Sequence, residues 1–141
     1  MEQRHIEVRR TARYHVLGDL ARARAIWVVL HGYGQLARYF LTRFERLEEG
    51  LAIVAPEALN RFYLDEAHNR VGATWMTRED RENEIADQLS YLDALVTELR
   101  GSRSDVPIHV LGFSQGVATA CRWSLFGKTK MDRLVLWAGS L

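Results

Sequence analysis

Short apolar runs alternate with amphipathic segments along most of this chain, and this alternation restricts its fold more than any other feature. The runs at 26–30 and 51–55 are continuous and stop at a glycine- or proline-containing turn, as strands buried on both faces do. Further apolar runs lie at 108–111 and 134–137. Strands that alternate with helices predict an α/β fold, a mostly parallel sheet with helices on both faces. In such a sheet, ligands bind at the carboxyl ends of the strands.

Helical periodicity fills the intervals between these runs. Apolar residues recur every three or four positions over 36–47 and again over 85–99, and a glycine follows each segment. Thr77 and Asp80 have the spacing of a capping box for the second helix. A third helix, rich in small residues, is predicted over 117–125.

Two other segments lack this pattern. Residues 5–12 and 12–17 alternate apolar and polar side chains, which predicts a leading antiparallel hairpin. Residues 57–76 have no clear period and are longer than most connections, so we expect a functional loop there.

Composition excludes several classes of protein. The chain has 141 residues, of which 48% are apolar, and its 19 basic and 18 acidic side chains nearly cancel. We therefore expect a single globular domain over residues 1–141 and no nucleic-acid partner. The strongest apolar run, 25–30, is far too short to span a membrane, and the amino terminus lacks a signal sequence, which favours a cytoplasmic protein.

Metal and disulfide chemistry find no support in the sequence. Cys121 is the only cysteine, and we expect it to fill space on a buried helix face. The histidines are not clustered, so no metal site is predicted.

The pentapeptide at 112–116, Gly-Phe-Ser-Gln-Gly, fits the G-x-S-x-G nucleophile elbow and lies between a predicted strand and a predicted helix. In such an elbow the serine sits in a strained turn that raises its hydroxyl above the sheet, and the flanking glycines remove side chains that would clash. Ser114 is therefore the candidate nucleophile. The backbone N–H of Gln115, at the start of the next helix, points to where an oxyanion would form.

The segment His31-Gly32-Tyr33-Gly34 follows the first central strand, where an oxyanion loop belongs. A tetrahedral intermediate needs two aimed donors, and the N–H groups of Tyr33 and Gln115 are the candidates. His31 precedes the nucleophile, whereas the base of this arrangement follows it, so we expect His31 to brace the loop.

These motifs resemble the phospholipase/carboxylesterase family of α/β hydrolases, which includes the acyl-protein thioesterases. The matching features occur in the family's order: His-Gly-x-Gly at 31–34, Ala-Pro at 55–56, Trp75, and the elbow at 112–116, while residues 72–80 are similar to bacterial esterases of this group. The resemblance implies an α/β-hydrolase fold with Ser114 as nucleophile, Tyr33 and Gln115 as oxyanion donors and Trp75 near the acyl pocket. It also implies small acyl ester or thioester substrates and neither a cofactor nor a metal.

The remainder of a catalytic triad is not visible. Histidines occur at positions 5, 15, 31, 68 and 109, all before Ser114, and the only acid after it is Asp132, which we expect to be a surface charge. Members of the family that the motifs resemble continue with two further strand and helix units, which carry the catalytic aspartate and histidine, so we expect the chain to be an incomplete hydrolase that lacks these last units. The apolar strand at 134–137 would then form an uncovered edge and favour a homodimer or aggregation.

Two functions therefore compete. The first is a serine carboxylesterase that hydrolyses short or medium acyl esters or thioesters through an acyl-serine intermediate. The second is a catalytically inactive hydrolase fold or binding module, and inactivity is what we expect of the 141 residues alone. A third reading makes His68, in the long loop, a replacement base.

Overall fold

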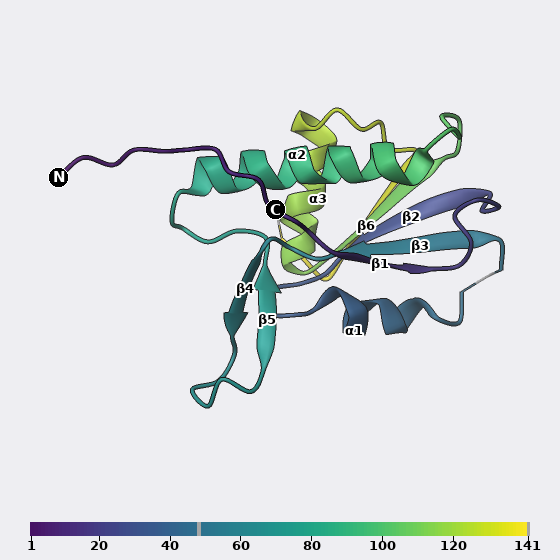
Figure 1. Ribbon diagram of the computed structural model, residues 1–141. Coiled ribbons are helices and arrows are strands. Elements are labelled where there is room, and N and C mark those ends of the chain that lie inside the picture. The colour runs from purple at the N-terminus through teal and green to yellow at the C-terminus, as the bar shows by residue number, and fades with distance from the viewer. Residues whose placement is uncertain (48, 141) are drawn as a thin grey trace.

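Helices cover both faces of a central twisted sheet in the computed structural model, which describes residues 1–47 and 49–140 (Figure 1). The helix α1 lies on one face, and α2 and α3 lie on the other. The strands are β1 (Tyr14–Leu17), β2 (Ala25–Leu30), β3 (Leu51–Pro56), β4 (Asn60–Tyr63), β5 (Val71–Thr74), β6 (Ile108–Phe113) and β7 (Arg133–Trp137). The helices are α1 (Ala37–Leu41), α2 (Arg81–Arg100) and α3 (Gln115–Phe126), with a 3₁₀ turn at Thr42–Phe44.

The sheet order is β1-β3-β2-β6-β7, and every pairing except that of β1 with β3 is parallel. The predicted α/β class with a mostly parallel sheet is therefore confirmed. Because β2 and β6 lie side by side, the loop after β2 and the elbow after β6 emerge together at the carboxyl edge of the sheet.

Successive residues of each central strand point to opposite faces, and this alternation builds two apolar layers. The layer under α2 and α3 contains Ile26, Val28, Leu30, Ala52, Val54, Ile108, Val110, Leu92, Val96 and Trp123. The layer under α1 contains Val29, Ile53, Ala55, Ala37, Phe40 and Leu41. Strands buried on both faces are continuous apolar runs for this reason.

The leading hairpin is not formed. Residues 1–13 have no regular secondary structure, and the side chains of Ile6 and Val8 are exposed. Only β1 forms a strand, and it pairs with β3 at the sheet edge instead of with residues 5–12. The prediction was wrong because the alternating pattern of those residues has no apolar surface to cover.

The first helix is shorter than predicted. It ends at Leu41, continues as the 3₁₀ turn, and leaves Leu47 exposed, so Gly50 does not cap it. The ring of Phe44 meets Phe40 edge-on at 5.4 Å, which completes the apolar layer on this face. Beyond that contact the helical pattern finds no core to cover.

The second helix begins differently from the prediction. Asp80 is its N-cap in a left-handed conformation with no side-chain capping bond, and Thr77 accepts the N–H of Glu79 instead. The capping box was therefore wrong. Gly101 does end the helix with φ 52°, as predicted. None of the helices in the described residues is long and apolar enough to cross a membrane.

Residues 57–76, expected to be irregular, contain the hairpin β4–β5, which projects from the sheet (Figure 1). The hairpin is tied to the loop after β2, because the N–H of Gly34 donates to Ala73 O at 2.8 Å and the N–H of Ala73 donates to Gln35 O at 3.1 Å. Each strand has only four residues, which is too short for an alternating pattern to be distinctive in the sequence. The predicted loop is thus an ordered arm beside the candidate site.

Candidate active site

Ser114 occupies the turn between β6 and α3 in a strained conformation, with φ 54° and ψ −117°. This backbone conformation costs a non-glycine residue on the order of 1–3 kcal/mol of strain, so contacts from the surrounding structure must stabilise it. Its own N–H donates to Trp137 O at 3.0 Å, and the serine is exposed. The side chain thus stands free at the carboxyl edge of the sheet.

The glycines of the pentapeptide make the turn possible. A Cβ on Gly112 would lie 2.5 Å from Gly116 O, and a Cβ on Gly116 would lie 2.3 Å from Leu30 O. Both distances are too short for any side chain, so α3 can pass this close to β6 and β2 only with glycine at both positions. The helix begins at Gln115, two residues before the predicted start.

The loop after β2 approaches the serine closely. A Cβ on Gly32 would lie 3.1 Å from the Cβ of Ser114. Most backbone N–H groups of this loop are hydrogen-bonded. Gly32 donates to Gln35 Oε1 at 2.6 Å, Gly34 donates to Ala73 O, and Gln35 donates to Gly32 O. Among the described residues, the N–H groups of Tyr33 and Gln115 have no acceptor.

His31 braces this loop, as expected. Its ring is fully buried, Nε2 accepts the N–H of Ala58 at 3.0 Å, and Nδ1 lies 2.8 Å from Gly32 O. Since Ala58 supplies a backbone donor, Nδ1 carries the proton and donates to Gly32. Burial lowers the pKa of His31, although the Gly32 carbonyl and the charge of Glu57 oppose that shift. The neutral ring therefore supports the loop through its two hydrogen bonds and does not act as a base.

Comparison with known proteins gives one clear result. No protein-family model matches the chain, and no curated protein matches it. Solved structures do: acyl-protein thioesterase 2 of Zea mays superposes with a TM-score of 0.68 at 20% identity, covering 93% of this chain and 63% of that one. The chain therefore has the α/β-hydrolase fold.

Two bacterial structures agree with this assignment and with the resemblance found in the sequence. A phospholipase/carboxylesterase from Dyadobacter fermentans DSM 18053 gives a TM-score of 0.68 at 21% identity over 93% of this chain and 61% of that one. A carboxylesterase from Mesorhizobium loti gives 0.67 at 20% identity over 89% of this chain and 59% of that one. The chain thus spans about three fifths of the length of these α/β hydrolases.

Gln115 connects the elbow of this α/β-hydrolase fold to the end of β5. Its Oε1 accepts the N–H of Trp75 at 3.0 Å, and its Nε2 donates to Thr74 Oγ1 at 2.8 Å and to Met76 O at 3.1 Å. The indole of Trp75 is 1% exposed, and its Nε1–H donates to His31 O at 2.8 Å. Such burial places Trp75 in the core behind the loop and does not support contact with an acyl group.

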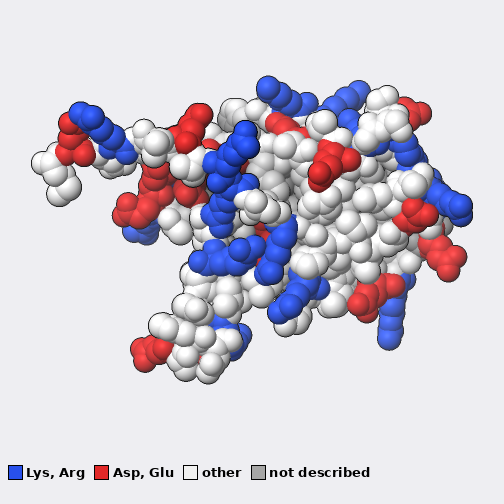
Figure 2. Space-filling model, in the orientation of Figure 1, with Lys and Arg blue, Asp and Glu red and all other residues white. Residues whose placement is uncertain are grey.

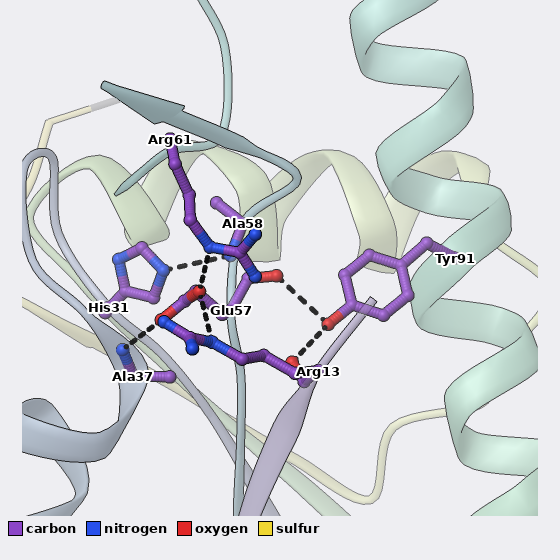
Figure 3. A network of polar contacts seen from close by, with 7 residues as sticks. All are labelled: Arg13, His31, Ala37, Glu57, Ala58, Arg61 and Tyr91. Atoms are coloured by element: carbon purple, nitrogen blue, oxygen red, sulfur yellow. Dashed lines mark hydrogen bonds and ion pairs between the residues drawn. The ribbon is translucent and has the colours of Figure 1, made fainter. Parts of the chain in front are cut away.

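A buried carboxylate that the motif search missed lies behind the same loop (Figure 3). Glu57 Oε2 accepts Nε of Arg13 and Nε of Arg61, each at 2.7 Å, and Oε1 accepts the N–H of Ala37 at 3.2 Å. The neighbouring Ala58 N–H holds His31, so one short segment after β3 supports both the loop and the start of α1. A carboxylate directly after a buried strand was the signal available in the sequence.

The charge of Glu57 is maintained by its donors. Burial alone would raise the pKa of this carboxyl, but the hydrogen bonds from Arg13, Arg61 and the Ala37 N–H outweigh it and hold the pKa below its ordinary value. Glu57 therefore stays ionised beneath the two guanidinium groups.

The other histidines do not complete a triad. His68 lies in the turn of the β4–β5 hairpin with its ring stacked on Tyr63 at 4.3 Å, and His109 lies on β6 with its ring 4.9 Å from that of Trp27. Within residues 1–47 and 49–140, neither a histidine nor a carboxylate hydrogen-bonds the Ser114 side chain. Asp132 is exposed and accepts the N–H of Ile108 at the opposite end of β6.

Cys121 is half-buried on α3 rather than fully buried. Across the part of the chain that the structure describes, no group of three or more His, Cys, Asp or Glu side chains is placed to hold a metal ion.

Proposed function

We propose that Ser114 is the nucleophile of a hydrolase acting on short or medium acyl esters or thioesters. One observation carries this proposal: an exposed serine in a strained elbow lies against a loop that leaves the N–H of Tyr33 free, next to the free N–H of Gln115. Serine adopts such a conformation at a cost in free energy, and within the described residues its hydroxyl makes no hydrogen bond that would offset this cost.

The reaction that fits this arrangement has two steps. Ser114 Oγ attacks the acyl carbon and the C–O or C–S bond to the leaving group breaks, which gives an acyl-serine and a free alcohol or thiol. Water then attacks the acyl-serine and releases a carboxylic acid and Ser114. In both steps negative charge develops on the carbonyl oxygen, where the N–H groups of Tyr33 and Gln115 would stabilise it.

A second candidate function is a hydrolase fold that binds without turnover. It is favoured by the absence of any histidine contact to Ser114 within the described residues, since serine is a poor nucleophile until a base takes its proton. An oxyanion hole without the full triad retains only residual catalysis.

The test is hydrolysis of p-nitrophenyl butyrate together with labelling by a fluorophosphonate probe, read by intact mass. We expect a single label on the wild-type chain, none on Ser114→Ala, and an unchanged label on Ser124→Ala, which removes an exposed serine of α3. Turnover with labelling supports the hydrolase. Absence of both labelling and turnover in the wild-type chain supports the binding function, because a serine without a base does not react with the probe. Loss of neither signal in Ser114→Ala would overturn the assignment of the nucleophile.

A further inference from the structure

A groove of about 650 Å³ lies between α1 and the β4–β5 hairpin, and its lining is strongly basic. Among the described residues it is lined by five arginines and no acidic side chain. Figure 2 shows basic side chains gathered where the hairpin joins the rest of the molecule. The arginines are Arg13, Arg38, Arg43, Arg61 and Arg70.

Two of these arginines are held in place from below. Glu57, whose side chain is 0% exposed, binds Nε and Nη2 of Arg13 and Nε of Arg61. Both arginine side chains remain partly open to solvent, at 45% and 38%. Neither terminal nitrogen of Arg61 has an acceptor among the described residues, so oriented donors are left over for a ligand. Holding a guanidinium in advance lowers the entropy lost when it binds an anion.

In the described residues, the guanidinium groups of the other three arginines form no ion pair with a carboxylate. Arg38 lies over the ring of Tyr39 at 4.7 Å, and Arg43 lies over the ring of Phe113 at 5.6 Å. The backbone N–H of Arg70 donates to the carboxylate of Asp65, and its carbonyl accepts the N–H of Leu64. Five guanidinium groups around one buried carboxylate repel one another, and a bound anion with several charges relieves that repulsion.

The loop after β2 connects the groove to the neighbourhood of Ser114. Gly34 lines the groove and is adjacent to Tyr33, while Gly32 in the same loop lies against Ser114. Arg43 stacks on Phe113, the residue before Ser114. The groove therefore adjoins the loop that carries the candidate oxyanion donor Tyr33.

We propose that this groove binds a phosphate or diphosphate group of a ligand. The planar guanidinium of arginine presents paired donors that match the oxygens of phosphate. The five arginines carry four positive charges more than Glu57 neutralises, which favours a multiply charged anion. Phosphate binding in the groove does not depend on the proposed function of Ser114.

The test is calorimetric titration of the whole chain with pyrophosphate at 0.15 M NaCl, a concentration at which isolated surface charges are largely screened. We expect saturable binding that weakens at least about tenfold in Arg38→Gln/Arg70→Gln. The control, Arg46→Gln/Arg133→Gln, removes the same charge at exposed positions outside the groove and is expected to bind within about twofold of wild type. Circular dichroism of each variant establishes that it is folded.

Several results would overturn the proposal: no binding by the wild-type chain, equal weakening in the control, or tighter binding of tricarballylate than of pyrophosphate. Ser114→Ala separates the groove from the catalytic assignment and is expected to bind pyrophosphate like wild type. Pyrophosphate binding without esterase activity supports the groove and leaves the nucleophile in question. Activity without pyrophosphate binding rejects the groove and retains the nucleophile.

Discussion

Gly32 lies directly against Ser114, so close that a Cβ on the glycine would be 3.1 Å from the Cβ of the serine. This contact joins the loop after β2 to the elbow after β6, and it keeps the space beside the serine hydroxyl free of side chains. The same loop is held by the ring of His31, which in turn rests on the segment at Glu57 and Ala58. Strain at the serine and support behind the loop are thus parts of one arrangement, and each part can be tested.

The first prediction concerns the strain at Ser114. Glycine adopts φ 54° and ψ −117° without the penalty of a Cβ, which is on the order of 1–3 kcal/mol, but it loses roughly 0.5–1 kcal/mol more backbone entropy on folding. We therefore expect Ser114→Gly to be about 1 kcal/mol more stable than Ser114→Ala, which keeps the strain. The measurement is the free energy of unfolding in urea. If Ser114→Gly were instead less stable than Ser114→Ala by the roughly 0.5–1 kcal/mol of backbone entropy, the elbow would not be strained.

A second prediction concerns the buried carboxylate of Glu57. Glu57→Gln keeps the shape but removes the charge that Arg13 and Arg61 share, and it turns an amide N–H₂ toward a donor. We expect a loss of about 2–3 kcal/mol in the free energy of unfolding. The matched control is Glu45→Gln, an exposed position expected to change stability by less than about 0.5 kcal/mol. Similar small effects in both variants would contradict a supporting role for Glu57.

The third prediction is a pH dependence from His31. Because burial lowers its pKa in the folded chain, the unfolded chain binds the proton first as pH falls. The stabilisation is complete above the unfolded value of 6.5 and decreases as pH falls toward the folded pKa, by at most about 1.4 kcal/mol per pH unit. Burial lowers the pKa of His109 also, so it adds to the same slope.

Urea unfolding between pH 8 and about 5.5, above the range in which ordinary carboxylates titrate, checks this dependence. We expect His31→Gln to flatten the slope relative to wild type, while His68→Asn, at an exposed turn position with φ 57°, leaves it unchanged. An unaltered slope in His31→Gln would assign the whole effect to His109.

The fourth prediction concerns association through β7. This strand is the sheet edge next to β6, and Leu134, Val135, Leu136 and Trp137 are 37–45% exposed. An apolar edge strand is a template for pairing with a second chain. We expect the 141-residue chain to elute as a dimer or larger species in size-exclusion chromatography with light scattering, and Val135→Lys to shift it toward the monomer. Leu47→Lys, which charges an exposed leucine elsewhere, serves as control; a monodisperse wild-type monomer would refute the idea.

The sequence by itself determined the features that depend on local pattern. Continuous apolar runs identified β2, β3 and β6, because strands in the interior of a sheet covered on both faces need such runs. The run at 134–137 identified β7 as well, although its side chains are exposed. The elbow was equally readable, since Gly112 and Gly116 are required by backbone contacts that allow no Cβ. The role of His31 followed from chain order, and its two hydrogen bonds confirm it.

Only the tertiary structure decided what depends on contacts between distant segments. Whether Trp75 meets substrate or core, and whether residues 5–12 form a strand, depends on which surfaces are available to cover them. The hairpin after β3 is held by backbone bonds to Gly34 and Gln35, which carry no side-chain signature. The arginine groove likewise forms where distant segments meet, and it contains Arg13, Arg38, Arg43, Arg61 and Arg70 above the buried Glu57. Side-chain period reports local burial, whereas a charge gains its partner only when the chain has folded.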